Sequence, residues 1–329
     1  MPPSTSTPAG WLVVGLGRHA DRYGLPALAR ARLGGAVAVC GSDPARAADV
    51  AARHAVPAWG TSLEDLLADP AVTHVYVCSG NDRHERQTTQ AASAGKHVLC
   101  EKPLAPAVEP AHRMVEACRR LGVALGTGFH LRHNPAHQRA RRMIVDGELG
   151  SLLWIRIEYV HALAPGDTTT RLGASRDIGT PSRGAMSGTG AHAVDLARWL
   201  LDDEILDVTA TMAESADGPQ RFVHVTGTTA RGVLVTLTAG RSRHPANGVT
   251  VVGTRGRLEI TGSIGGPGAG TVRVVSGAGE QAVELPPHDP YTAQFDAFVG
   301  GTGACATGAD GLVSLQVVEA VERHLGGVS

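Results

Sequence analysis

The sequence has few of the features of a secreted, membrane-bound or nucleic-acid-binding protein. Its five cysteines are odd in number and scattered along 329 residues, which disfavours a disulfide scaffold or a zinc ribbon and fits a reducing cytoplasm. No apolar run approaches the roughly 20 residues that span a bilayer. The net charge of −1 gives no strong attraction to nucleic acid or to an anionic membrane. We therefore expect a cytoplasmic protein whose partners are small molecules, with neither nucleic acid nor membrane among them.

Lysine is also scarce. Of the 30 basic residues, only Lys96 and Lys102 are lysines. Coding bias accounts for an excess of arginine, but a lysine that persists against it can do what arginine cannot, because an ammonium loses its proton when its surroundings lower its pKa. The scarcity directs attention to these two positions, of which Lys96 is expected to be solvated at a helix–strand turn.

The first part of the chain alternates between strand and helix patterns, which is typical of a parallel sheet covered by helices. Strands are expected at 11–15, 36–40, 74–79, 97–100 and 123–129, and helices at 26–33, 44–54, 62–68, 84–94 and 108–121. After that the pattern changes to short strands with turns between 205 and 284, which predicts an antiparallel sheet. The remaining elements are a strand at 152–161, a long loop at 162–188, and helices at 135–146, 191–201, 291–299 and 308–325.

A glycine-rich turn follows the first expected strand. Gly15-Leu16-Gly17-Arg18-His19-Ala20 matches G-x-G-x-x-A between a strand and a helix. The first glycine makes the tight turn, the second lets a pyrophosphate approach the backbone, and the alanine allows close helix packing. Exposed N–H groups and the helix dipole hold the phosphates. The pattern predicts a Rossmann dinucleotide-binding domain over 11–126, preceded by a disordered leader over 1–10.

The end of the second strand bears on which dinucleotide binds. Gly41 and Ser42 stand where an NAD site usually carries an acid, and Arg46 follows. A hydroxyl and a cation suit a 2′-phosphate, so we favour NADP over NAD. Asp43 is the alternative acid, displaced by two residues, but we interpret it as the N-cap of the next helix, with Pro44 as the first helical residue.

A longer motif lies between Asn81 and Leu104. Asn81 and His84, followed by AGKHVLCEKPL over 94–104, resemble the signature of the glucose–fructose oxidoreductase, inositol dehydrogenase and rhizopine-catabolism (Gfo/Idh/MocA) family. Five further stretches fit the resemblance: Phe129…Arg132…Pro135, Gly147-Glu148-Leu149-Gly150, Gly190-Ala191-His192…Asp195, Gly253-Thr254…Gly256 and Thr307-Gly308…Asp310-Gly311.

The resemblance implies a fold and an activity. The fold is α/β, with an N-terminal Rossmann domain and a C-terminal α+β domain over 127–329 that contains a large open, mainly antiparallel sheet. In the family this sheet often mediates assembly, so we expect a homodimer or homotetramer. The activity is the oxidation or reduction of sugars and polyols by hydride transfer to or from a nicotinamide.

The resemblance also assigns the catalytic pair. Lys102 is the lysine beside the nicotinamide and the substrate oxygen, and His192 occupies the position of the general acid/base. The chemistry agrees, because the cofactor carries only the hydride and the protein must handle the proton and the developing alkoxide charge. The alternatives are a surface salt bridge between Lys102 and Glu101, and a capping or core role for His192.

The expected binding residues follow from these motifs. The cofactor-binding residues are Gly15, Gly17, Arg18, His19, Gly41, Ser42, Arg46, Ser79, Asn81, His84, Glu101 and Lys102. The expected substrate contacts are His130, Arg132, Arg176 and His192. No metal is expected, although histidines stand at 130, 133 and 137, because no carboxylate or cysteine is near and Pro135 breaks the helical spacing. His133 and His137 are expected to be solvated.

Two features bear on the substrate. The family commonly has an aspartate four residues before the histidine, where this sequence has Gly188, so either Asp177, Asp195 or Ser187 orients His192 or the substrate differs from a simple polyol. The loop with Arg171, Arg176, Asp177 and Arg183 either binds an anionic substrate, such as a nucleotide-linked sugar, or is simply solvated.

The sequence thus predicts an NADP-dependent oxidoreductase that interconverts a hydroxyl and a ketone on a sugar, sugar nucleotide or cyclitol, with Lys102 and His192 handling the proton. One alternative is an NAD-dependent inositol or sugar dehydrogenase. An alternative of another class is a non-catalytic sensor that binds a nicotinamide or a sugar, which only Gly188 favours.

Overall fold

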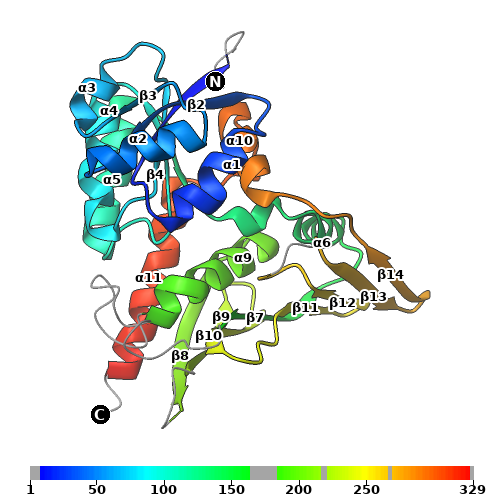
Figure 1. The fold of residues 1–329 in the computed structure, drawn as a ribbon. Coiled ribbons are helices and arrows are strands. Elements are labelled where there is room, and N and C mark those ends of the chain that lie inside the picture. The colour runs from blue at the N-terminus through cyan, green and yellow to red at the C-terminus, as the bar shows by residue number, and fades with distance from the viewer. Residues whose placement is uncertain (1–7, 164–183, 216–220, 266–268, 327–329) are drawn as a thin grey trace. The chain divides into compact units, whose positions relative to one another are not determined.

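The computed structural model describes residues 8–163, 184–215, 221–265 and 269–326. It divides into two compact units, Met1–His133 with Asp289–Val313 and Asn134–His288 with Ser314–Ser329, and Figure 1 labels many of their helices and strands. The expected substrate contact Arg176 and its neighbours Arg171, Asp177 and Arg183 lie outside the described residues. Within the described ranges, no helix combines the length and the apolar character needed to cross a bilayer.

The first unit is built on a six-stranded parallel sheet in the order β3-β2-β1-β4-β5-β6. Its strands are β1 (Ala9–Val14), β2 (Gly34–Cys40), β3 (Ala58–Gly60), β4 (His74–Val77), β5 (His97–Cys100) and β6 (Leu125–Thr127). The strand order reverses between β1 and β4, and ligands of such sheets bind at the carboxyl ends of the strands beside this switch point. The expected Rossmann fold is confirmed.

Helices flank this sheet. They are η1 (Ala20–Gly24), α1 (Leu25–Leu28), α2 (Pro44–Arg53), α3 (Leu63–Leu67), η2 (Asn81–Arg83), α4 (His84–Ser93), α5 (Val108–Leu121), η3 (His130–His133) and α10 (Pro290–Gly300). Local chemistry sets their ends: the side chain of Asp43 caps α2, that of Ser62 caps α3, and Gly122 ends α5 with φ of 69°. These expected helix boundaries are therefore confirmed to within a residue or two.

The core of the first unit includes a helix from near the end of the chain. Phe295 of α10 lies edge-on to Trp11 of β1, with ring centroids 5.1 Å apart, and to Tyr76 of β4 at 5.0 Å. All three side chains are buried, and α10 lies beside α1 (Figure 1). Aromatic pairs in this geometry stabilise a core beyond their area alone, so 289–313 completes the first unit.

Three expectations for the first unit need correction. β1 begins at Ala9, inside the expected leader, because the Gly10 backbone pairs with Thr73. The helix expected at 26–33 ends at Leu28 and is preceded by the π-helical turn η1. Pro26 stands in the first turn of α1, where its missing N–H costs no helical hydrogen bond. His133, expected to be solvated, is buried at 2% exposure.

The second unit contains an eight-stranded sheet in the order β14-β13-β12-β11-β7-β10-β9-β8. The strands are β7 (Leu152–Ala162), β8 (Ile205–Glu214), β9 (Arg221–Thr229), β10 (Leu234–Ser242), β11 (Gly248–Gly253), β12 (Gly256–Thr261), β13 (Thr271–Ser276) and β14 (Gly279–Glu284). Every pairing is antiparallel except β7 with β10. The expected large, mainly antiparallel sheet is confirmed, with the strand at 152–161 as a member.

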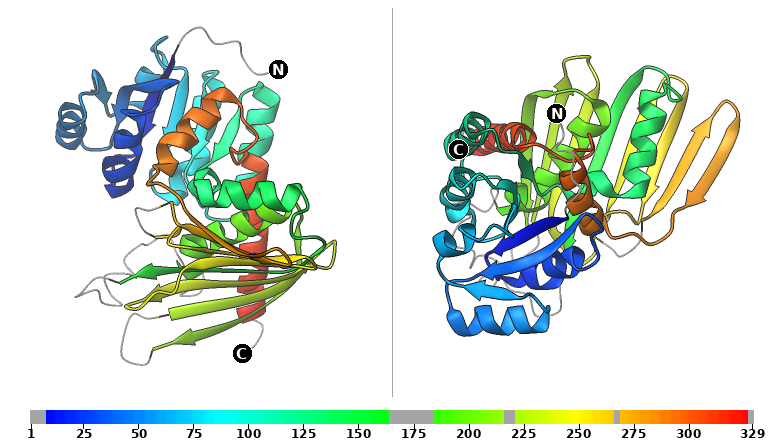
Figure 2. Two further views of the ribbon diagram at one scale, coloured as in Figure 1. Left: turned by 90° about the vertical axis from the view of Figure 1, so that its right-hand side faces the viewer. Right: turned by 90° about the horizontal axis from the view of Figure 1, so that it is seen from above.

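Two helices, α6 (Pro135–Val145) and α9 (Ala191–Leu201), cover one face of this sheet. α9 packs on β7 and β10, and α6 packs on β12 and β13, as Figure 2 shows. His137 of α6 is fully buried rather than solvated, because its Nε2 lies 2.9 Å from Ser263 Oγ beneath the helix. The loop expected at 162–188 ends earlier than predicted, since 186–190 form the π-helical segment η4 (Met186–Gly190) that leads into α9. The last helix, α11 (Gly308–Gly326), begins in the first unit and ends in the second.

Candidate cofactor and catalytic site

The glycine-rich turn has the geometry that phosphate binding needs. Gly15 has a φ of 93°, and a Cβ there would lie 2.5 Å from the backbone of Ser79 at the end of β4. No described residue lies within 4 Å of a Cβ built at Gly17, which is consistent with a second glycine that leaves room for a phosphate. Ala20 is fully buried where the helix packs on the sheet. The three small residues thus have the three separate roles that the pattern predicts.

A pocket of about 700 Å³ opens at the carboxyl ends of β1, β2 and β4. The expected cofactor-binding residues that line it are Gly15, Gly17, Arg18, His19, Gly41, Ser42, Arg46 and Ser79. The remaining four, Asn81, His84, Glu101 and Lys102, are not among its lining residues in the described chain, and their contact with a cofactor stays a prediction.

Part of this pocket was not expected from the sequence. The segment 61–64 lines it, together with Arg83, Arg86, Gln87 and Gln90 of η2 and α4. The first segment follows β3, which pairs with β2, so recognising β3 would have pointed to it. The spacing of Arg83 and Arg86 at the start of a helix, after a strand, is the signal for the second group.

The part of the pocket that follows β2 contains Asp43. Its Oδ1 accepts hydrogen bonds from the N–H groups of Ala45 at 2.9 Å and Arg46 at 3.1 Å. The interpretation of Asp43 as an N-cap is confirmed. Arg46 Nε donates to the carbonyl oxygen of Leu16 at 2.7 Å, which lays the guanidinium across the glycine-rich turn.

Three hydrogen-bonded side chains, two of them buried and one half-buried, lie next to the turn. The Tyr76 hydroxyl donates to Glu101 Oε1 at 2.7 Å. His19 Nε2 lies 3.0 Å from that hydroxyl and 3.2 Å from Glu101 Oε1. Burial alone would raise the pKa of Glu101, but the charge and hydrogen bond of His19, with smaller contributions from its other neighbours, lower that pKa from 4.5 to about 2. The Glu101 carboxyl is therefore ionised over the whole physiological range.

Lys102 directly follows this glutamate beyond the end of β5, and its side chain is half-buried. Burial lowers the pKa of the Lys102 ammonium, and the charge of Glu101 opposes that effect only in part. The Lys102 backbone N–H donates to Glu101 Oε2 at 3.2 Å. A lysine whose pKa is lowered towards neutrality can exchange a proton with a substrate oxygen.

His84 contacts the loop that follows β5 and carries Lys102. The ring is fully buried, with Nδ1 3.1 Å from the carbonyl oxygen of Pro103 and Nε2 3.2 Å from that of Ser79. Burial lowers the pKa of His84 more than its hydrogen bonds to backbone carbonyls raise it. The ring links the end of β4 to the loop that carries Lys102.

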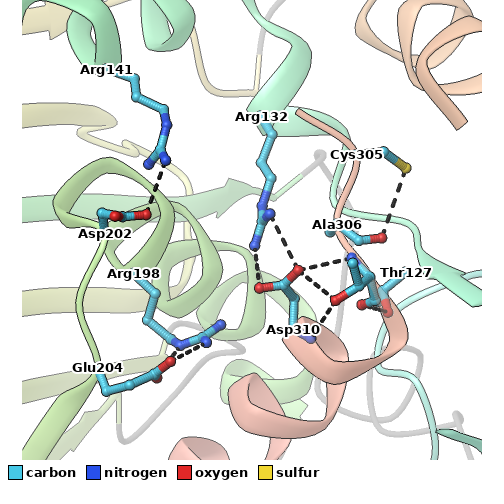
Figure 3. Close-up of polar contacts among 10 residues, drawn as sticks. Thr127, Arg132, Arg141, Arg198, Asp202, Glu204, Cys305, Ala306 and Asp310 are labelled. Atoms are coloured by element: carbon cyan, nitrogen blue, oxygen red, sulfur yellow. Dashed lines mark hydrogen bonds and ion pairs between the residues drawn. The ribbon is translucent and has the colours of Figure 1, made fainter. Parts of the chain in front are cut away.

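The two expected substrate contacts of the first unit differ in their surroundings. His130 is half-buried and stacks on Tyr291, with ring centroids 4.4 Å apart, and burial lowers the pKa of His130 to about 3. Arg132 is buried, and its Nη2 lies 3.1 Å from Asp310 Oδ1 (Figure 3). His130 is thus neutral, and Arg132 forms an ion pair within the unit. Among the described residues, no group of three or more His, Cys, Asp or Glu side chains could hold a metal ion.

His192 lies in the second unit, at the start of α9. It is buried, and its ring centroid lies 5.7 Å from that of Tyr159 on β7, a neighbour that the sequence did not predict. Of the groups expected to orient it, Asp195 is buried one turn further along α9, whereas Asp177 lies outside the described residues. Among the described residues, none lies within 4 Å of a Cβ built at Gly188, the position of the missing aspartate.

Comparison with known families and curated proteins agrees with this architecture. The model of the oxidoreductase family with an NAD-binding Rossmann fold (GFO_IDH_MocA) matches residues 9–129, and that of the GFO/IDH/MocA C-terminal domain matches 137–259. The chain is 32% identical over 321 residues to 1,5-anhydro-D-fructose reductase of Ensifer adhaerens, covering 95% of each protein. It is 27% identical to inositol 2-dehydrogenase of Rhizobium meliloti, covering 88% of each.

Solved structures show the same fold. An aldose–aldose oxidoreductase of Caulobacter crescentus, complexed with glycerol, matches with a TM-score of 0.85 at 23% identity over 98% of this chain and 99% of that one. KijD10, a 3-ketoreductase of Actinomadura kijaniata in complex with NADP and TDP-benzene, matches with a TM-score of 0.78 at 25% identity over 97% and 98%. From its dinucleotide pocket and these matches over both of its units, the chain belongs to the Gfo/Idh/MocA family of NAD(P)-dependent oxidoreductases.

Proposed function

We propose that this protein is an NADP-dependent oxidoreductase that interconverts a hydroxyl and a ketone on a sugar, a sugar nucleotide or a cyclitol. The observation that carries the proposal is the half-buried Lys102, whose pKa is lowered by burial. It is the second residue after β5, at the carboxyl edge of the sheet, and β5 pairs with β4, one of the two strands at the switch point. Perturbed lysines at such positions are typical of proton-transfer sites.

The choice of NADP rests on the part of the pocket that follows β2, where the ribose of the dinucleotide would bind. Ser42, Asp43 and Arg46 line it, and the carboxylate of Asp43 accepts hydrogen bonds from two backbone N–H groups as a helix cap. A hydroxyl and a guanidinium suit a 2′-phosphate, which a free carboxylate would repel. The KijD10 complex contains NADP, whereas another relative, from Bacillus subtilis, is a scyllo-inositol 2-dehydrogenase for NAD⁺; NAD is therefore the alternative cofactor.

The bound nicotinamide would supply or accept the hydride. In the direction of reduction, the Lys102 ammonium donates a hydrogen bond to the carbonyl oxygen and stabilises its developing negative charge. We propose that the His192 imidazole acts on the same oxygen as the general acid that protonates it. In the direction of oxidation the steps reverse: His192 accepts the hydroxyl proton as the general base, while the Lys102 ammonium stabilises the negative charge that develops on the oxygen. A lowered pKa makes the Lys102 ammonium more acidic and therefore a stronger hydrogen-bond donor to that oxygen.

Sugar-like substrates are proposed from the relatives, which include an anhydrofructose reductase and inositol dehydrogenases. A homodimer or homotetramer through the second unit's sheet is proposed from that sheet's own pattern. β7 points Ile155 and Ile157 towards the covering helices, and the alternate side chains of Trp154, Arg156 and Glu158 line the opposite face. That face is broad and mixes polar with apolar groups, as subunit interfaces often do.

The two lysines provide a matched test. Lys102→Ala should lower turnover by about 10²- to 10⁴-fold, the usual contribution of a proton-transferring group. Lys96→Ala is the control, because Lys96 Nζ donates to the carbonyl oxygen of Val72 and is not a lining residue of the pocket. Turnover would be screened on ketosugars, polyols and nucleotide-linked sugars with both cofactors.

Each outcome has a distinct meaning. Unchanged turnover in folded Lys102→Ala would refute the mechanism, and tighter binding of NADH than of NADPH would refute the cofactor assignment. Tight cofactor binding with no turnover on any carbonyl or alcohol would favour a non-catalytic sensor. Gly188, in place of the family aspartate, is the feature that favours this alternative.

A further inference from the structure

His19 stands at an unusual junction in the first unit. It belongs to the glycine-rich turn and lines the dinucleotide pocket, yet its Nε2 lies within 3.2 Å of both the Tyr76 hydroxyl and Glu101. The ring thus joins the phosphate-binding turn to the loop of Lys102. Neither the glycine pattern nor the requirements of hydride transfer explain why an ionisable ring occupies this position.

The hydrogen-bond directions specify where the ring carries a proton. The hydroxyl of Tyr76 has one hydrogen and donates it to Glu101 Oε1. The carboxylate of Glu101 is ionised and can only accept. Both oxygens near His19 Nε2 therefore act as acceptors towards it, so Nε2 carries a hydrogen. The charge of the ring then depends on Nδ1 alone, and a carboxylate 3.2 Å away favours the doubly protonated, cationic form.

We propose that Glu101 and Tyr76 hold His19 as an imidazolium that binds the phosphates of the dinucleotide, so that cofactor affinity falls when His19 loses its proton. The inference rests on the proposed dinucleotide site, but it requires neither a particular substrate nor the proposed role of Lys102. Glu101 and Tyr76 are positioning residues here, and His19 is a binding residue.

The surroundings of His19 agree with this charge state. Burial by itself lowers the pKa of His19, but the charge and the hydrogen bond of Glu101 outweigh it and leave the pKa above its ordinary 6.5, with Lys102 opposing. The other titratable groups that face the ring are Tyr76, Tyr23, Tyr291 and His130. Of these, His130 is neutral because its pKa is about 3. Glu101 is thus the anion that holds the proton on His19.

The test measures cofactor affinity by calorimetry, without substrate, at pH values from 6 to 9. NADP⁺ and NAD⁺ are both titrated, so the result does not depend on which of them is preferred. Wild-type affinity should fall across a transition above pH 6.5, and His19→Asn should lose this transition, leaving binding about fivefold weaker at pH 6, the magnitude of one partly exposed charge pair. Glu101→Gln should move the transition below pH 6.5.

Two controls match these variants within the first unit. His54→Asn removes another histidine–carboxylate pair, His54 Nε2 to Asp21 Oδ1 at 2.8 Å, and Glu109→Gln removes an exposed carboxylate that pairs with Arg113. Both should follow the wild-type curve, including any contribution from titration of the 2′-phosphate itself. A His19→Asn curve that is parallel to the wild-type curve would overturn the proposal.

A second measurement covers the case in which Glu101→Gln does not fold. NMR titration of ¹³C-labelled histidine rings, with His19 assigned by its loss in His19→Asn, gives the pKa of His19 in the wild-type protein. A value above 6.5 supports the proposal, and a value at or below 6.5 overturns it. These results are separable from the proposed function, because that function fails on the turnover of Lys102→Ala and not on a binding curve.

Discussion

The ion pair between Arg132 and Asp310 leads to a prediction about whether an expected substrate contact is also structural. Arg132 follows β6, its side chain is 4% exposed, and its Nη2 lies 3.1 Å from Asp310 Oδ1 (Figure 3). Asp310 also accepts hydrogen bonds from the N–H and the hydroxyl of Thr307, both at 2.8 Å, while the Asp310 N–H donates to that hydroxyl at 3.1 Å. This is a capping box at the start of α11, and Arg132 ties it to the sheet.

The perturbation is Arg132→Gln. Removing one partner of a buried ion pair costs about 3–5 kcal/mol when the other charge is left buried and unpaired. Asp310 is a quarter exposed and keeps its bonds to Thr307, so a smaller loss of about 2–3 kcal/mol is expected, equivalent to about 5–10 °C in Tm. The low pKa of Asp310 should rise towards its ordinary value in the variant, because burial raises it and the charge of Arg132 is the main opposing effect.

The assay pairs thermal and urea unfolding with steady-state kinetics. Arg113→Gln is the control, since Arg113 pairs with Glu85 at the surface and such pairs contribute at most about 1 kcal/mol. A wild-type Tm in Arg132→Gln would refute the structural reasoning. A lower Tm with an unchanged KM would limit Arg132 to structure, and a KM raised tenfold or more in the folded variant would support the expected substrate contact as well.

Three further predictions follow from the same coordinates. Gly15→Ala places a Cβ 2.5 Å from the backbone of Ser79 at a φ of 93°, so cofactor affinity should fall at least about tenfold, and wild-type affinity by calorimetry would contradict this. The pKa of Glu101, lowered from 4.5 to about 2, stabilises the fold above pH 4.5, and the gain is lost as the pH falls through about 2. Glu101→Gln should therefore cost about 3 kcal/mol at pH 7 and distinctly less at pH 3, and equal losses in urea unfolding at both pH values would be inconsistent with it. Gly188→Asp restores the aspartate that the family commonly has, at a position where no described residue lies within 4 Å of the new Cβ. It should keep stability within about 1 kcal/mol and shift the ratio of kcat/KM between polyol and nucleotide-sugar substrates; an unchanged ratio would show that the missing aspartate does not select the substrate.

Much of the fold was predictable because its determinants are local. The helix at Val108–Leu121 agrees with its expected boundaries, since an apolar stripe and a following glycine mark its length and its end. Asp43 and Ser62 mark their helix starts for the same reason, because a cap acts on N–H groups two or three residues away. Such features can be recognised without knowledge of the tertiary structure.

Other parts depend on tertiary neighbours and could not be predicted from periodicity. β3 has only three residues, too few for a pattern, and it exists because it pairs with β2. The segment that begins at Asp289 belongs to the first unit because Phe295 fills the space between Trp11 and Tyr76. A hydrophobic pattern shows that a helix has a face to bury but not which surface will cover it.

The candidate site likewise has one part that a local motif predicts and another part that depends on tertiary neighbours. The residues of the glycine-rich turn are consecutive, so one motif was enough to find them. The group formed by His19, Tyr76 and Glu101 comes from three separate elements, and it forms because β1, β4 and β5 are neighbours in the sheet. The family signature included Glu101 only as the residue before Lys102 and gave no reason for its charge.

The structure indicates a reason, because the charge of Glu101 affects both the pKa of Lys102 and the pKa of His19. The proposed role of Lys102 requires a lowered pKa, but the adjacent carboxylate of Glu101, which is ionised, stabilises the Lys102 ammonium and works against this. A cationic His19 would partly neutralise the charge of Glu101. Burial then remains the largest influence on the pKa of Lys102. The positive charge of His19 would also lie at the pocket of an anionic cofactor, where it is an advantage and not a cost. The same proton on one ring therefore helps to bind the cofactor and to keep the pKa of the neighbouring lysine low.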